Sequence, residues 1–130
     1  MPRVVAIAMS FSVALAGCAP APTFRGDELY AVHCAGCHGR FGEGDGPAAA
    51  DRTAPMPDLR YLAARNAGTY PRDRVIAIVD GRSVVAAHVE REMPIWGDAF
   101  RQMDGDASGA MANARIEALA DFIGTMQQAQ

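Results

Sequence analysis

Apolar residues recur at the spacing of a helix in three stretches of the chain. Side chains three and four positions apart share one face of a helix, so each stretch predicts a helix with one buried side. The predicted helices and their apolar positions are 25–32 (Leu29, Tyr30, Val32), 72–79 (Val75, Ile76, Val79) and 111–125 (Ile116, Leu119, Phe122, Ile123). No convincing strand–turn–strand pattern accompanies them, and the sequence therefore predicts an all-α domain of short helices.

Turn-forming residues separate these helices. Asp58 is placed to cap a further helix over 59–67 that Gly68 would end, and 98–103 predicts one helical turn. Glycines crowd the segment 39–47 and predict a loop of tight turns. Long loops are uncommon in a small domain, and a group bound at its centre would account for them.

The start of the chain has the order of a targeting segment. Arg3 precedes an apolar stretch at 4–15 that is too short to span a bilayer. This stretch ends in Leu-Ala-Gly-Cys, which resembles a bacterial lipobox, so we expect cleavage before Cys18 and a diacylglycerol on its thiol. The alternative is an ordinary secretory signal followed by an incidental cysteine.

The expected organisation has three parts. A lipoprotein-type signal peptide occupies 1–17, a lipid-anchored, proline-rich tether occupies 18–24, and one domain occupies 25–130. The mature protein would then lie in the periplasm, anchored to a membrane by the lipid on Cys18. Without that lipid it would be soluble in the periplasm after the signal is cleaved.

Charge and composition exclude some partners. The net charge is −3, which gives no basis for binding nucleic acid. Every basic residue is arginine, because the chain contains no lysine. A partner that docks onto a lysine-rich face is therefore excluded.

The motif that carries chemistry is Cys34-Ala-Gly-Cys37-His38. Two thiols three residues apart can reach the two vinyl groups of a porphyrin and form thioethers, and the histidine that follows can ligate the iron. We therefore expect one haem c, attached covalently through Cys34 and Cys37, with His38 as an axial ligand. Such bonds retain the haem even in a small core.

Three other interpretations of the paired cysteines remain open. A thioredoxin-like motif would need a strand before Cys34, where the pattern is helical. A zinc site would need about four nitrogen or sulfur ligands, which Cys34, Cys37 and His38 could complete with His33 or His88. A plain disulfide between the two cysteines is also possible outside the cytoplasm.

Met93 is the expected second axial ligand of the iron. Pro94 stiffens the loop and favours an extended backbone at Met93, and a weak neutral thioether must be held in place to remain bound. With both axial positions filled, the iron leaves no site for a small-molecule substrate, and we expect no catalytic residue. The competing ligands are Met56, Met103, Met111 and His88.

In their order and spacing, these pieces resemble a class I cytochrome c. The similarity spans roughly 25–126, and the resemblance implies a small cytochrome c fold of three to five short helices wrapped around one haem. The segments that carry it are the first helix with the haem motif (26–39), the glycine-rich loop (42–47), the Met-Pro-x-Trp-Gly loop (93–97) and the last helix (119–123).

The resemblance also implies roles for single residues. The first and last helices would cross near the haem edge, where Gly26 and Tyr30 meet Leu119 and Phe122. The carbonyl of Pro47 would accept a hydrogen bond from the second nitrogen of the axial imidazole. Other residues expected near the haem or its propionates are Trp96, Arg82 or Arg91, Asn66 and Tyr70. The stretch 104–109 looks like an additional loop, which we interpret as a solvated turn and not a calcium site.

These observations predict a single-haem protein that shuttles one electron between respiratory redox partners in the bacterial periplasm. Contacts with those partner proteins would be transient. The alternatives are a haem domain or subunit of a larger dehydrogenase or oxidase complex, and a sensor or enzyme whose haem is five-coordinate.

Overall fold

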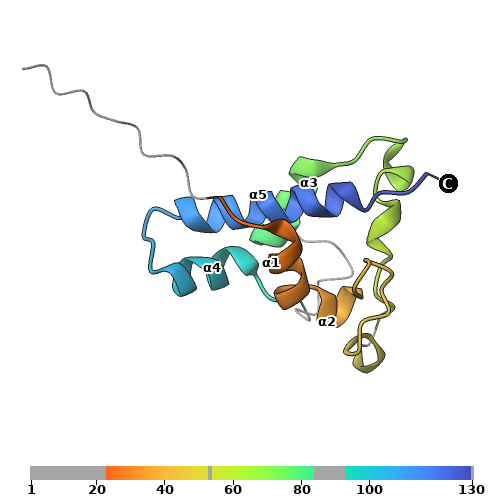
Figure 1. Cartoon of the computed structure of the whole chain (residues 1–130), viewed down its shortest axis with the longest axis horizontal. Coiled ribbons are helices and arrows are strands. Elements are labelled where there is room, and N and C mark those ends of the chain that lie inside the picture. The colour runs from red at the N-terminus through yellow and green to blue at the C-terminus, as the bar shows by residue number, and fades with distance from the viewer. Residues whose placement is uncertain (1–22, 53, 84–92, 130) are drawn as a thin grey trace, which may run out of the picture.

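The structure is a computed structural model that describes residues 23–52, 54–83 and 93–129. Within these ranges every regular element is a helix, as Figure 1 shows, which confirms the all-α prediction. The α-helices are α1 (Gly26–His33), α2 (Ala35–His38), α3 (Arg72–Asp80), α4 (Trp96–Asp104) and α5 (Ala110–Thr125), and the short 3-10 helices are η1 (Ala49–Asp51), η2 (Leu59–Tyr61) and η3 (Ala64–Asn66).

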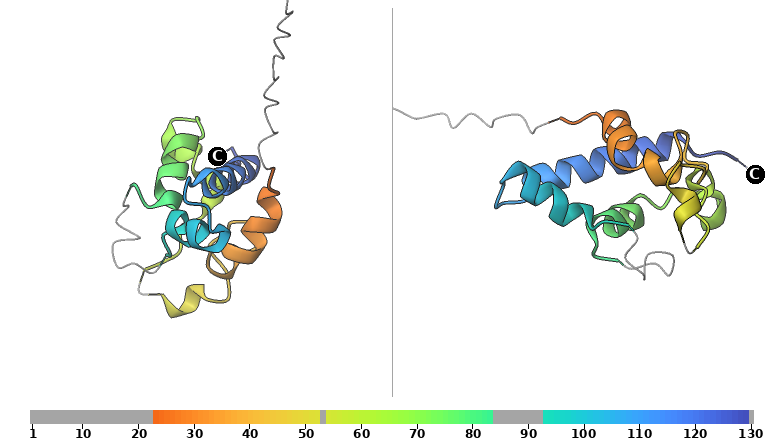
Figure 2. Two further views of the ribbon diagram at one scale, coloured as in Figure 1. Left: turned by 90° about the vertical axis from the view of Figure 1, so that its left-hand side faces the viewer. Right: turned by 90° about the horizontal axis from the view of Figure 1, so that it is seen from below.

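The longest helix, α5, lies at the centre of the core. Helices α1, α3 and α4 each pack against it, as the views of Figures 1 and 2 show. The side chains of Ile116, Leu119 and Ile123 are almost completely buried there, and Phe122 is partly buried. The predicted apolar face of the last helix is therefore confirmed.

The crossing of α1 and α5 depends on a glycine. A Cβ atom at Gly26 would lie 2.1 Å from the carbonyl oxygen of Ala118 and 2.8 Å from Cβ of Phe122. Close by, the Tyr30 and Phe122 rings pack with their centroids 5.4 Å apart. The first and last helices thus cross as expected, with Ala118 taking the place next to Gly26.

The predicted apolar side of α1 is wrong at Val32. Leu29 and Tyr30 are buried as predicted, but Val32 is 75% exposed. At 3.6 residues per turn, Val32 lies about 110° around the helix from the midpoint of Leu29 and Tyr30. It therefore faces solvent, while the other two side chains face α5.

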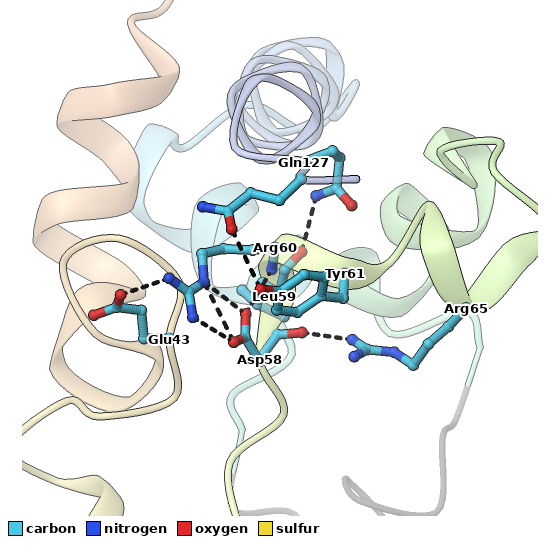
Figure 3. Close-up of polar contacts among 8 residues, drawn as sticks. Glu43, Asp58, Leu59, Arg60, Tyr61, Arg65 and Gln127 are labelled. Carbon is cyan, nitrogen blue, oxygen red and sulfur yellow. Dashed lines mark hydrogen bonds and ion pairs between the residues drawn. The ribbon is translucent and has the colours of Figure 1, made fainter. Parts of the chain in front are cut away.

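The predicted helix over 59–67 is wrong, because the segment forms only the short helices η2 and η3. In an α-helix the carbonyl of Leu59 would accept the N–H of Ala63. Here the side-chain amide of Gln127 stands between them: its Nε2 donates to Leu59 O at 2.8 Å (Figure 3), and its Oε1 accepts from Ala63 N at 2.9 Å. A residue from the end of the chain has replaced the local helical bond.

Around this segment, a polar network ties the glycine-rich loop to η2. Asp58 caps η2 as predicted, because its Oδ1 accepts the N–H of Arg60 at 2.9 Å. The Arg60 guanidinium then bridges two carboxylates, at 2.7 Å from Asp58 Oδ2 and 2.6 Å from Glu43 Oε1 (Figure 3). Arg60 therefore links the glycine-rich loop to the residue that caps η2.

The next helices agree more closely with the prediction. Helix α3 covers the predicted range 72–79, with Val75 and Val79 buried, and Gly81 ends it in a left-handed conformation (φ 86°). Helix α4 is longer than the helical turn predicted at 98–103, since it begins at Trp96 and continues to Asp104. The predicted loop at Trp96 is therefore wrong.

The stretch 104–109 is more than the solvated turn we expected. The Asp104 side chain is 5% exposed and pairs with Arg115 of α5 at 2.7 Å. The carboxylate of Asp106 accepts the N–H of Met111 at 3.0 Å and so satisfies the first turn of α5. Asp104 therefore joins α4 to α5, and Asp106 caps the start of α5.

The predictions for the start of the chain fall outside the described residues. These are the signal peptide at 1–17 and the lipid attachment at Cys18, with most of the tether. In the part that the structure describes, none of the helices has both the length and the hydrophobicity to cross a bilayer.

Candidate functional site

A cavity of about 400 Å³ lies at the centre of the described domain. Its wall is largely apolar and comes from η2, the turn after it, α3 and α5; the apolar side chains include Leu59, Leu62, Val75, Ile78, Val79 and Ile123. Cys34, His38 and Met93 line the same cavity. Residues that are far apart in the sequence, and that we predicted to hold haem, therefore meet at one space.

One helical turn arranges the Cys-x-x-Cys-His motif. The N–H groups of Cys37 and His38 both donate to the carbonyl of Cys34, at 3.1 and 2.9 Å. Residues four apart share a helix face, and Cys34 and His38 both line the cavity, whereas Cys37 does not line it. His38 is 8% exposed, and both cysteines are free thiols here, which stand for the thioethers of an attached haem.

The glycine-rich loop packs tightly against this turn. A Cβ atom at Gly46 would lie 2.5 Å from Gly36 O, and the N–H of Gly44 donates to His38 O at 2.8 Å. Pro47 follows directly but is exposed and does not line the cavity. The bond from the imidazole to the Pro47 carbonyl stays a prediction.

The two cysteines have different surroundings. Burial, and then the proximity of Cys37, raises the pKa of the Cys34 thiol to about 12, so this thiol is protonated at neutral pH before attachment. The Cys37 sulfur accepts a hydrogen bond from Nη2 of Arg52 at 3.5 Å. Arg52 was missed from the sequence, because it lies fifteen residues away in a loop without periodicity.

Met93 is partly buried and packs against the hydrophobic core. Three of its competitors as ligands, Met56, Met103 and Met111, do not line the cavity, and Met103 is 58% exposed. His88 lies outside the described residues. Among the described methionines, the geometry thus favours Met93 as the ligand.

Trp96 does not line the cavity. Its ring packs on His33 of α1, with centroids 4.8 Å apart, and on Phe100 one turn further along α4 at 5.5 Å. Burial, and then the nearby charge of Arg115, lowers the pKa of His33. Trp96 and His33 therefore form part of the α1–α4 packing, and the structure does not bring Trp96 to the expected haem site.

The polar residues of the cavity lining include Arg65, Asn66 and Arg74. Nη2 of Arg65 donates to Asp58 O at 2.5 Å, and the Asn66 amide donates to Thr69 O. Arg74 makes no ion pair with the described residues. Two arginines beside an apolar cavity are suited to the two carboxylates at one edge of a haem.

Of the residues expected near the haem, Asn66 lines the cavity, but the arginines expected to pair with a propionate are not the ones found there. Arg82 pairs with Asp80 and does not line the cavity, and Arg91 lies outside the described residues. The hydroxyl of Tyr70 donates to Ala120 O at 2.6 Å, away from the cavity lining. Helical spacing could have identified Arg74, because it lies four residues before Ile78 on one face of α3.

A zinc site would need about four nitrogen or sulfur ligands close together. Within the described ranges, no three His, Cys, Asp or Glu side chains are arranged to hold a metal ion. By contrast, the residues present fit haem c: the cavity lining holds the Cys34 thiol, the buried His38 imidazole, the Met93 thioether and two arginines, and the second free thiol, Cys37, lies one turn from Cys34.

Comparison with known proteins gives one match. The family model of cytochrome c matches residues 24–127, which is most of the chain and all of the elements described above. Neither curated proteins nor solved structures give a match. The chain belongs to the cytochrome c family, and it is a haem-based electron-transfer protein with covalently attached haem c.

Proposed function

We propose that this protein is a single-haem shuttle that carries one electron at a time between respiratory redox proteins in the bacterial periplasm. The observation that carries the proposal is the meeting of Cys34, His38 and Met93 at one apolar cavity. Haem supplies the one-electron iron couple when it is bound. The protein's part is to hold that group, fill its axial positions and control its surroundings.

In this proposal, Cys34 and Cys37 would hold the porphyrin through thioethers, and His38 and Met93 would supply the imidazole and thioether ligands of its iron. The apolar side chains of Val75, Val79 and Ile123 and their neighbours would exclude water from the cavity around the group. A low dielectric and a thioether ligand both favour the ferrous state, so we expect a positive reduction potential. Six-coordinate iron leaves no position for a substrate, which favours a carrier over an enzyme.

The membrane anchor is a further part of the proposal. The sequence before the domain supports cleavage before Cys18 and lipidation of its thiol, with the tether at 18–24 holding the domain near the membrane. Replacing Cys18 by Ser should release the protein from the membrane fraction or block its processing. Wild-type protein found entirely in the soluble fraction would contradict the anchor.

The test of the ligation is an optical spectrum of the purified holoprotein in both redox states. Oxidised wild-type protein should show the weak near-infrared band of a methionine–iron bond, and ferrous protein should bind carbon monoxide slowly. Met93→Ala should lose the band and bind carbon monoxide rapidly. Met103→Ala, which changes an exposed methionine outside the cavity lining, is the matched control and should behave like wild type.

If the wild-type protein lacks the band and binds carbon monoxide as fast as Met93→Ala, the haem is five-coordinate. A sensor or enzyme would then replace the carrier. If the mature chain, made with the attachment machinery, gains no tetrapyrrole mass, the covalent haem itself is contradicted.

A further inference from the structure

Asp80, at the C-terminal end of α3, carries a buried carboxylate that does not line the haem cavity. Its side chain is 9% exposed, and its two oxygens meet the guanidinium groups of Arg82 and Arg101. The distance from Asp80 Oδ1 to Arg101 Nη1 is 3.5 Å. Removing a carboxylate from water is unfavourable unless it is paired, so these arginines stabilise Asp80 in its place.

Asp80 joins the end of α3 to the start of α4. A Cβ atom at Gly97, in the first turn of α4, would lie 2.1 Å from Asp80 Oδ1 and 2.7 Å from Asp80 O. The lack of a side chain at Gly97 therefore lets the two helices approach until the carboxylate and Arg101 meet. Gly81, which follows α3, and Ile95, which precedes α4, are also in close contact, because a Cβ atom at Gly81 would lie 2.5 Å from Cγ2 of Ile95.

This junction lies next to the expected axial methionine. Helix α3 supplies Val75, Ile78 and Val79 to the cavity wall, and Met93 lines the same cavity three residues before α4 begins. Pro94 restricts the backbone between Met93 and α4. The position of Met93 relative to the cavity is therefore set by how α4 is fixed to α3.

We infer that Asp80 is a positioning residue for the axial ligand, and that its pairing with Arg101 holds Met93 on the haem iron. The inference rests on the proposed ligation by Met93. A thioether is a weak neutral ligand, so its effective affinity for iron depends on how well the surrounding backbone is pre-organised. Loosening the α3–α4 junction makes the methionine easier to displace without removing any contact to the haem.

The experiment measures imidazole binding to the oxidised holoprotein, because imidazole must displace methionine to reach the iron. Asp80→Asn and Arg101→Gln should each lower the imidazole dissociation constant about tenfold, in the direction of Met93→Ala. The methionine–iron band should weaken in the same variants at equal haem content. The double variant should change little beyond either single one, since both remove the same contact.

Asp98→Asn is the matched control. It removes the exposed partner of the same arginine, which lies 2.8 Å from Arg101 Nη2, but leaves the pairing with Asp80. It should bind imidazole like wild type. If Asp80→Asn does not accumulate as holoprotein, Arg101→Gln provides the answer, because it keeps the carboxylate and its contact with Arg82.

The outcomes separate this inference from the proposed ligation. If Met93→Ala binds imidazole more tightly than wild type while Asp80→Asn and Arg101→Gln do not, the positioning role is overturned and the ligation stands. A lower unfolding stability with unchanged imidazole affinity also overturns the positioning role, since it shows only a packing role. If wild type and Met93→Ala bind imidazole equally, Met93 is not the ligand and both proposals fall.

Discussion

The close crossing of α1 and α5 allows a quantitative test at Gly26. In Gly26→Ala the new Cβ atom would lie 2.1 Å from the carbonyl oxygen of Ala118, whereas ordinary contact begins at 3.4 Å. The backbones must therefore separate by about 1.3 Å, because the opposing atom belongs to the main chain and cannot rotate away. Such overpacking costs about 1–3 kcal/mol of folding free energy.

A second effect opposes this cost. Alanine favours a helix over glycine by up to about 1 kcal/mol, and less at the first position of α1 than in a helix interior. The separation also weakens the packing of Tyr30 on Phe122, a pair worth about 0.5–1.5 kcal/mol beyond its buried area. The steric and packing losses exceed the gain in propensity, so we expect Gly26→Ala to be destabilised by about 2 kcal/mol.

The assay is chemical denaturation of the oxidised holoprotein, with the free energy of unfolding taken from the midpoint and slope. Gly36→Ala is the control, because a Cβ atom at that helical glycine meets nothing within 4 Å. It should be neutral or slightly stabilising. A Gly26→Ala protein as stable as wild type would refute the argument that this crossing requires glycine.

Three further changes have defined outcomes. Arg74→Gln removes a cation from the cavity lining and should lower the midpoint potential by roughly 20–60 mV in a redox titration. The control is Arg72→Gln, which should change the potential less, because the wild-type Arg72 side chain pairs with Asp121 at 2.6 Å. Gln127→Ala leaves a carbonyl and an N–H of the η2–η3 segment unpaired and should reduce the unfolding free energy by about 1–3 kcal/mol in denaturation experiments. Hydrogen bonds from the N–H of Met111, and then from the hydroxyl of Ser108, lower the pKa of Asp106 below its usual 3.8. The ionised Asp106 therefore contributes to stability above pH 3.8, and this contribution is lost as the pH falls through the pKa of the folded state. Asp106→Asn should accordingly lose less unfolding free energy than wild type on acidification.

The fold could be predicted where the controlling interactions are local. Helical spacing located α1, α3 and α5 to within a residue or two of their observed ends. The segment 59–67 failed because Gln127, more than sixty residues away, takes the hydrogen bonds that a helix would use. No window of neighbouring residues contains that information.

The candidate site also divides into residues that a local motif predicts and residues whose contacts depend on the tertiary fold. The spacing of Cys34, Cys37 and His38 is a local motif, and Met93 was singled out by the proline beside it; the structure brings Cys34, His38 and Met93 to one cavity. Of the two arginines at the cavity, Arg74 shares a helix face with Ile78, but Arg65 could not be chosen from the sequence, because twelve arginines are scattered along the chain and only the tertiary fold decides which of them line the cavity. Trp96 was placed by resemblance alone, and its contact with His33 depends on how α4 lies against α1.

The contact between Gly46 and the haem-attachment turn limits which substitutions this sequence can accept during evolution. A Cβ atom there would lie between 2.5 and 2.7 Å from three main-chain atoms, which belong to Ala35, Gly36 and Cys37. A clash with a side chain can be relieved by a compensating mutation elsewhere, but every amino acid has the same main-chain atoms. Position 46 is therefore closed to substitution in any descendant that keeps this backbone, whatever changes accumulate around it.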